Sequence, residues 1–204
     1  MANISGTNGD DVLSGTPQSD NVGLLAGNDV FFAGAGNDVV LGGDGNDSIR
    51  GDAGRDQLNG DAGDDFLVGG SDADRLNGGV NNDTLDGGTG VDTLAGGTGF
   101  DRFDFNSTLE SGVGVGNRDV ITDLVRGFDR LDLSTIDARA GLSGNQGFGF
   151  VGTGAFSGEG QVRTFVSGVT DNLVVEVNTS GSSGAEFQIE LAGLQSVASL
   201  DFIL

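Results

Sequence analysis

The unit that decides the fold of this chain is clearest in residues 42–50, Gly42-Gly43-Asp44-Gly45-Asn46-Asp47-Ser48-Ile49-Arg50. Its aspartate, Asp47, has counterparts every nine residues through the first half of the chain, with one ten-residue step around Pro17. These aspartates are Asp10, Asp20, Asp29, Asp38, Asp47, Asp56, Asp65, Asp74, Asp83, Asp92 and Asp101. An apolar residue follows two positions after each of them: Val12, Val22, Phe31, Val40, Ile49, Leu58, Leu67, Leu76, Leu85, Leu94 and Phe103. A register kept over eleven units indicates a repeated structural element.

A period of nine residues is too short for a pair of helices, and it predicts a six-residue turn followed by a three-residue strand. Successive side chains of a strand point to opposite faces, so the apolar series is expected to face inward. Two units then complete one coil with a strand in each of two facing sheets, and the eleven units give five to six coils.

The units resemble the calcium-binding RTX nonapeptide Gly-Gly-x-Gly-x-Asp-x-U-x, in which U is apolar, over residues 5–104. The resemblance implies an all-β fold, a right-handed parallel β-roll. It also implies several Ca²⁺ ions held between turns one coil apart by Asp carboxylates and glycine carbonyls. The implied pairs are Asp29 with Asp47, Asp38 with Asp56, Asp47 with Asp65, Asp56 with Asp74, Asp65 with Asp83, Asp74 with Asp92 and Asp83 with Asp101. The glycines expected to offer carbonyls are Gly34, Gly36, Gly43, Gly45, Gly54, Gly63, Gly88, Gly90, Gly97 and Gly99.

The charge of the repeats favours cations for reasons independent of any family. Residues 1–104 contain 19 Asp, no Glu and 4 Arg, a net charge of −15. Calcium prefers about six to eight hard oxygen ligands, and glycine lets consecutive carbonyls converge. The alternative is that the aspartates only hydrogen-bond to turn backbones. The turns before Asp10 and Asp20 are poor in glycine, so we expect weak sites there, and Asp72 and Asn81 replace a turn glycine in two later units.

Composition excludes several classes of function. The formal charge of −22 argues against nucleic acid as a partner. The chain has no His, Lys or Cys, which removes the usual hydrolase, zinc and thiol chemistry, and we expect no enzymatic activity. Residues 1–15 do not have the pattern of a Sec signal peptide, and no stretch approaches the length of a membrane span, so we expect no stable membrane insertion.

After Asp104 the period stops, which predicts two domains, 1–104 and 105–204. The second half is expected to form antiparallel strands that cap the roll, with one helical turn at 195–200. The strands are predicted at 119–125, 131–133, 148–151, 161–166, 172–177 and 185–191, with a turn at 180–184 between the last two. Glu110 and Asp119 flank a glycine-rich loop and could hold an isolated calcium ion or simply be solvated.

The order of segments in the second half resembles the C-terminal domain of serralysin metalloproteases. The resemblance is carried by residues 103–105, 119–124, 127–134, 156–158 and 160–163 and by the ending Asp201-Phe202-Ile203-Leu204. It does not bring protease activity, because that needs a His-rich zinc helix. It implies an uncleaved C-terminal signal in the last four residues, read by type I ABC secretion machinery, and a secreted, extracellular protein. Alternatively, the ending is the last buried strand, either without a signal role or in addition to it.

Two functions remain open from the sequence. The first is a non-catalytic calcium-binding module that folds outside the cell and acts as a secretion carrier, a chaperone for a passenger domain or a matrix component. The second is a module that binds a polysaccharide such as alginate, through calcium or a row of arginines. The arginines proposed for that row are Arg50, Arg75 and Arg102. We also expect an outward apolar stripe to be covered by another segment or chain; its members are Val30, Phe32, Val39, Leu41, Phe66 and Val68.

Overall fold

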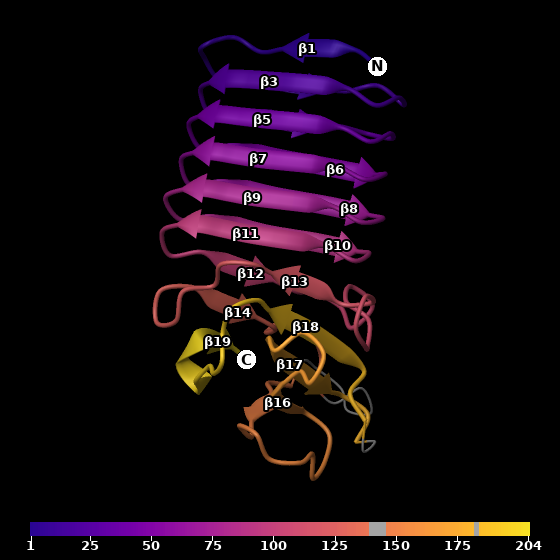
Figure 1. Ribbon diagram of the computed structural model, residues 1–204. Coiled ribbons are helices and arrows are strands. Elements are labelled where there is room, and N and C mark those ends of the chain that lie inside the picture. Colours follow the sequence, from indigo (N-terminus) through magenta and orange to yellow (C-terminus); the bar gives the residue numbers. More distant parts are fainter. Residues whose placement is uncertain (139–145, 182–183) are drawn as a thin grey trace.

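The computed structural model describes residues 1–138, 146–181 and 184–204. This part of the chain is a β-solenoid built on two sheets, one of eleven strands and one of eight. Successive repeat units alternate between the sheets, and the coils stack from the N-terminal end toward the second half, which lies at the other end (Figure 1). The described residues contain no helix that is long and apolar enough to cross a bilayer.

The strands have the following bounds. In spatial order, the larger sheet contains β1 Asn3–Ser5, β3 Asn21–Ala26, β5 Val39–Asp44, β7 Gln57–Ala62, β9 Arg75–Val80, β11 Thr93–Thr98, β13 Asp119–Ile121, β18 Phe187–Leu191, β17 Leu173–Asn178, β16 Gln161–Val166 and β15 Gly149–Phe150. The smaller sheet, also in spatial order, contains β19 Phe202–Ile203, β14 Arg130–Asp132, β12 Arg102–Asp104, β10 Thr84–Thr89, β8 Phe66–Ser71, β6 Ser48–Ala53, β4 Val30–Phe32 and β2 Val12–Ser14. A short 3₁₀ helix, Ser199–Asp201, precedes β19.

Neighbouring strands of the repeats are parallel and place equivalent residues side by side, as in the pairs Val40 with Leu58 and Ile49 with Leu67. The predicted inward residues from Val22 to Phe103 are at most 2% exposed, which confirms this part of the apolar series. Each such side chain stabilises the fold by about 1.5–3 kcal/mol when it leaves water. Together these side chains belong to one continuous apolar core between the two sheets.

The division of each unit between strand and turn differs from the prediction. Full units form six-residue strands joined by three-residue links, rather than three-residue strands joined by six-residue turns. The strand bends at its fifth residue, where Gly43 has a φ of 109° and Asp52 a φ of 70°. The residues at the bend still pair with the next coil, as in Gly43 with Asp61, and the hydrogen-bonded ladder therefore continues through it.

The first repeat lies one residue later than predicted. Leu13 pairs with Phe31 and faces the core, whereas Val12 is 77% exposed. The aspartate of this unit is therefore Asp11, nine residues before Asp20, and the expected ten-residue step is wrong. Two adjacent aspartates caused the error, since Asp10 is also two residues from an apolar residue.

In the second half, both pairing modes occur. Strands β16, β17 and β18 are antiparallel, as predicted. The prediction is wrong for β13 and β14, which pair in parallel with β11 and β12 and prolong both sheets of the roll. Strand β19, which lies outside the predicted strands, also pairs in parallel, with β14. It is also wrong for β15, which lies parallel to β16. The helical turn is limited to the 3₁₀ helix, and residues 182–183 of the expected turn lie outside the described residues. The boundary at 104/105 stays a prediction, with both sheets continuing across it.

The outward apolar residues do not form one stripe. Val39 and Leu41 lie on the larger sheet, and the other four lie on the smaller sheet. Phe32, Leu41 and Phe66 are 45–46% exposed, so no other part of the described chain covers these three, and their cover by a partner chain stays a prediction.

Candidate metal-binding ladders

Two ladders of aspartates run along the opposite edges of the roll, at the points where the links lead into the strands. In each ladder the backbone N–H of one aspartate donates to Oδ1 of the next, one coil later. Ladder A consists of Asp11, Asp29, Asp47, Asp65, Asp83, Asp101 and Asp129, with N–O distances of 2.7–3.0 Å. Ladder B consists of Asp20, Asp38, Asp56, Asp74, Asp92 and Asp119, with distances of 2.6–2.8 Å.

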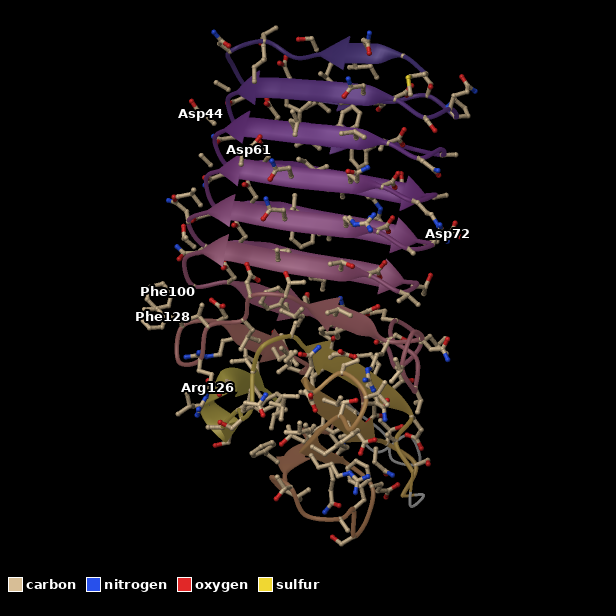
Figure 2. All side chains as sticks on the ribbon, in the orientation of Figure 1. Asp44, Asp61, Asp72, Phe100, Arg126 and Phe128 are labelled. Atoms are coloured by element: carbon tan, nitrogen blue, oxygen red, sulfur yellow. The ribbon has the colours of Figure 1, made fainter. Side chains whose placement is uncertain are left out.

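Figure 2 shows the two edges. Asp44 and Asp61 belong to the turns that lead to Asp47 and Asp65 of ladder A, and they lie together at one edge (Figure 2). Asp72, in the turn that leads to Asp74 of ladder B, lies at the opposite edge (Figure 2). Aspartates 18 residues apart therefore lie one coil apart and each series is confined to its own edge, while the sharing of a calcium ion within the predicted pairs stays a prediction.

The second carboxylate oxygen distinguishes the members of the ladders. Within the described residues, Oδ2 is buried and has no hydrogen-bond partner in ten aspartates. They are Asp29, Asp38, Asp47, Asp56, Asp65, Asp74, Asp83, Asp92, Asp101 and Asp119. The turn-bonding alternative thus accounts for Oδ1 and leaves Oδ2 unexplained. A buried carboxylate needs a partner or a proton, because leaving its charge uncompensated costs several kcal/mol.

Three members are satisfied without a metal. Oδ2 of Asp11 accepts the N–H and hydroxyl of Thr7, and Oδ2 of Asp20 accepts those of Thr16. At the far end of ladder A, Oδ2 of Asp129 accepts the N–H of Val125 at 2.6 Å. At the N-terminal end, threonine at the second turn position therefore supplies the partner for Oδ2 that a cation could supply in the later coils. This agrees with the weak sites expected at Asp20, and Asp10 lies outside the ladders because Asp11 takes its place.

In five turns, the glycine five residues before the ladder aspartate forms a cradle at the unpartnered oxygen. An ideal Cβ on Gly60 would collide with Oδ2 of Asp65 and would lie 2.6 Å from the carbonyl oxygen of Gly78, one coil later. The same arrangement recurs at Gly42, Gly51, Gly69 and Gly78. Each cradle thus brings one carboxylate oxygen and one carbonyl oxygen to the same small space, the hard-oxygen set that calcium prefers. These five glycines were not among the predicted ligands, although each of them lies five residues before its aspartate in the sequence.

The glycines predicted as ligands occupy the second and fourth turn positions. Most of them have positive φ, and an ideal Cβ on Gly45 would overlap the carbonyl oxygen of Gly27 in the preceding coil. Backbone conformation and close stacking therefore require glycine there, while ligation by their carbonyls stays a prediction. Asp72 and Asn81 adopt the same left-handed conformation, with φ of 76° and 88°.

Burial raises the pKa of most ladder carboxyls, and repulsion from neighbouring aspartates adds to the effect. The pKa rises to about 6 for Asp47, Asp56, Asp65 and Asp101, to about 7 for Asp74, Asp83 and Asp119, and to about 8 for Asp92. Backbone N–H donors oppose this rise but do not cancel it. By contrast, the N–H of Ala2 and the groups of Thr16 hold the pKa of Asp20 below its usual value. The ion-free ladders therefore attract protons as well as cations.

Glu110 lies in the loop between β12 and β13. Its carboxylate accepts the N–H of Asn106 at 2.7 Å, and burial raises its pKa to about 7. Asp119 belongs to ladder B with Asp92, so an isolated site formed by Glu110 and Asp119 stays a prediction. Across the described residues, no three carboxylates gather in a metal-binding group, and the candidate sites instead combine carboxylates with backbone carbonyls.

The last four residues are part of the fold. Asp201 is buried and its Oδ1 accepts the N–H of Gly127 at 2.9 Å. Phe202 is 8% exposed and pairs with Leu131, Ile203 is 38% exposed, and Leu204 is half-buried. The strand alternative for the ending is therefore correct, and a role as a secretion signal stays a prediction.

Comparison with known proteins agrees with this geometry. The family model of the RTX calcium-binding nonapeptide repeat matches residues 5–40, 24–49, 32–67, 41–76 and 68–103. No curated protein matches the chain. Similar solved structures include two subunits of the Azotobacter vinelandii mannuronan C5-epimerase. AlgE6R3 is 23% identical with a TM-score of 0.44, covering 97% of this chain and 80% of that one. AlgE6R2 is 24% identical with a TM-score of 0.42, covering 80% and 91%. The extracellular lipase LipA of Serratia marcescens is 15% identical with a TM-score of 0.36, covering 98% and 39%.

Proposed function

Since the chain is an RTX calcium-binding protein, we propose that it is a non-catalytic extracellular module that leaves the cell through type I secretion machinery and folds on binding Ca²⁺. The observation that carries the proposal is the row of ten buried Oδ2 atoms without hydrogen-bond partners in the described residues. Calcium ions would neutralise these oxygens, and the binding free energy would then become folding free energy.

The residues present fit calcium. Carboxylate Oδ2 atoms and the carbonyls of the first turn glycines would hold the ions, and each ion would supply charge neutralisation between two coils. Magnesium fits less well because it demands a small octahedral shell. The carboxylates of the ladders are taken up by this role, and the chain has no His, Cys or Lys to supply a catalytic base or nucleophile, which supports a non-catalytic module.

Secretion before folding follows from the same charges. At the low calcium of the cytosol, the unneutralised ladders oppose folding and leave the chain open for export, with the last four residues as the signal. Outside the cell, calcium of about 10⁻⁴–10⁻³ M would trigger folding. The module would then act as a secretion carrier or support a passenger domain.

Circular dichroism during a calcium titration of the metal-free protein tests the proposal. We expect β-structure and compaction to appear together and cooperatively with calcium, and magnesium at the same concentrations to have little effect. Full β-signal in the metal-free protein at neutral pH would contradict folding on binding.

A groove on the outer face of the larger sheet favours a second candidate, binding of an anionic polysaccharide. It has a volume of about 390 Å³ and crosses β5, β7, β9 and β11. Arg75 and Gln57 line it together with Asn59 and Asn77, whose side chains are joined by a hydrogen bond of 2.8 Å. Apolar contacts come from Leu41. Amides, a guanidinium and an apolar patch are the groups that would contact uronate hydroxyls, carboxylates and sugar rings.

The predicted row of arginines is wrong. Arg50 and Arg102 lie on the other sheet, where Arg50 pairs with Asp52 and Arg102 with Asp132 at 2.8 Å. Calorimetric titration with alginate oligosaccharides in calcium, comparing the wild type with Arg75→Gln, tests the groove. Arg50→Gln is the matched control on the opposite sheet, and equal affinity of all three proteins would refute the groove as the site.

A further inference from the structure

Ladder B continues beyond the nonapeptide repeats. The matched repeats end at residue 103, yet the N–H of Asp92 donates to Oδ1 of Asp119, 27 residues later, at 2.8 Å. This bond has the length found within the repeats, where the partners are 18 residues apart. Asp92 and Asp119 are both 0% exposed, and Oδ2 of each has no hydrogen-bond partner in the described residues. The last step of ladder B thus has the same unsatisfied oxygens as the repeat steps.

We propose that Asp92 and Asp119 hold an additional calcium ion and that this ion fastens the C-terminal sheet to the repeat array. The proposal rests on calcium binding by the ladders and extends it to a residue that no repeat contains. The inserted loop between β12 and β13 brings Asp119 into register although the spacing is longer.

Asp119 connects directly to the C-terminal sheet. It is the first residue of β13, which lies between β11 of the array and β18, and it pairs with Ile189. Its N–H donates to the hydroxyl of Ser111 at 2.7 Å, and that hydroxyl donates to the carbonyl of Gln188 at 2.6 Å. An ion that fixes the carboxylate of Asp119 against Asp92 would therefore also hold β13 and Ser111 in place, and both of these contact β18.

The neighbouring buried cation serves another carboxylate. Arg118 is 3% exposed, and its Nε donates to Oε2 of Glu190 at 2.8 Å. It also donates to Oε1 of Gln188 at 3.2 Å. Arg118 thus pairs with side chains of β18. The negative charges of Asp92 and Asp119 would then be neutralised by the proposed metal ion.

Ladder A provides an internal contrast. Its last member, Asp129, also accepts an N–H on Oδ1, from Asp101, but its Oδ2 accepts the N–H of Val125. Nearby, the exposed rings of Phe100 and Phe128 stack with centroids 5.2 Å apart at this edge (Figure 2). The last member of ladder A is therefore satisfied by a protein group and only Asp101 of its last step keeps an unpartnered Oδ2, whereas in the last step of ladder B both Asp92 and Asp119 keep one within the described residues.

The experiment compares full-length Asp119→Asn with Asp129→Asn as the matched control. Asparagine keeps the Oδ1 that accepts the N–H of the preceding aspartate, so a change reports on Oδ2. Bound calcium per chain is measured by equilibrium dialysis, and protection of 48–53 and 187–191 by hydrogen-exchange mass spectrometry across a calcium titration. We expect Asp119→Asn to bind one ion fewer and to need several-fold more calcium to protect 187–191, while 48–53 keep their wild-type midpoint.

Three outcomes separate the hypotheses. Wild-type stoichiometry in Asp119→Asn would refute the additional site. Loss of one ion with unchanged protection of 187–191 would refute the link to the C-terminal sheet. A wild-type protein that binds no calcium would instead refute the proposed function. If Asp119→Asn does not fold, Asp92→Asn is compared with Asp74→Asn. Asp74 and Asp92 each belong to two steps of ladder B, so an equal loss of calcium supports the additional site and a smaller loss in Asp92→Asn refutes it.

Discussion

The two oxygens of each ladder carboxylate have different roles. Oδ1 is a structural acceptor that sets the distance between coils, and it is bonded whether or not Oδ2 has a partner. Oδ2 is the oxygen that we propose for a cation. The second residue of the turn decides whether Oδ2 has a protein partner, because threonine supplies donors to it at Asp11 and Asp20. A local sequence difference of one side chain thus determines where the metal-binding part of each ladder begins.

Substitution of Asp65 should therefore differ from substitution of Asp20. Asp65→Asn should lower the number of bound calcium ions and raise the calcium midpoint, because it removes a free buried oxygen. Asp20→Asn should leave the number of ions unchanged, since both oxygens of Asp20 already accept hydrogen bonds. Equilibrium dialysis checks both, and equal losses in the two variants would contradict the division of roles.

The cradle glycines should tolerate no side chain. Gly60→Ala places a methyl group against Oδ2 of Asp65 and the carbonyl of Gly78, and overpacking of this kind costs about 1–3 kcal/mol. Gly23→Ala is the control, because nothing lies within 4 Å of its ideal Cβ. Thermal unfolding in calcium should show a lower midpoint for Gly60→Ala and a nearly unchanged one for Gly23→Ala. Similar midpoints would mean that the turn can relax around the methyl group.

At the scale of elements, the periodic part of the fold, which is the stack of repeat strands, could be predicted from the sequence. The inward residues from Val22 to Phe103 and their alternation between two sheets followed from spacing alone. Strands β13 and β14 could not be recognised as members of the roll, because their spacing from the preceding coil is 27 and 28 residues. A signal was present nonetheless: Asp119 and Asp129 are each followed two positions later by a buried apolar residue, as are the repeat aspartates from Asp20 to Asp101.

The ending of the chain is an element whose two proposed roles can be separated. Removing residues 202–204 deletes β19 and its pairing with β14, so the calcium-loaded protein should lose some thermal stability. If the ending is also a signal, secretion from a host with the exporter should fall much further than stability. Phe202→Ala is the companion variant, since it removes the buried ring and keeps the chain length. Normal secretion of the truncated chain would contradict the signal role.

At the scale of the whole molecule, the proposed function makes the ladders a link between folding and both calcium and protons. The pKa of Asp74 and Asp83 rises to about 7 and that of Asp92 to about 8, from an ordinary value of 3.8. A raised pKa means that the folded, ion-free chain binds more protons than the unfolded chain. The ion-free fold therefore gains stability as the pH falls through this range and loses it as the pH rises.

Calcium and protons should consequently compete. As the pH falls from 8 to 5.5, the calcium concentration at the folding midpoint should decrease, because protons on the raised-pKa carboxyls already stabilise the ion-free fold, whereas each ion that binds this fold must displace protons. Over the same range, the metal-free protein should show more β-structure at the lower pH. Circular dichroism at the two pH values measures both effects, and a calcium midpoint independent of pH would contradict the linkage.

The 18-residue step of the ladders also constrains how such a protein can change length during evolution. Loss of two units, for example residues 48–65, keeps Leu41 and Arg75 on the same sheet and preserves the groove side of the molecule. Loss of one unit, such as residues 66–74, also preserves both ladders, but it transfers Arg75 to the sheet opposite Asn59. Gain or loss of two units at a time therefore keeps every later residue on its own sheet. Gain or loss of a single unit moves all later residues to the opposite sheet while both ladders remain continuous.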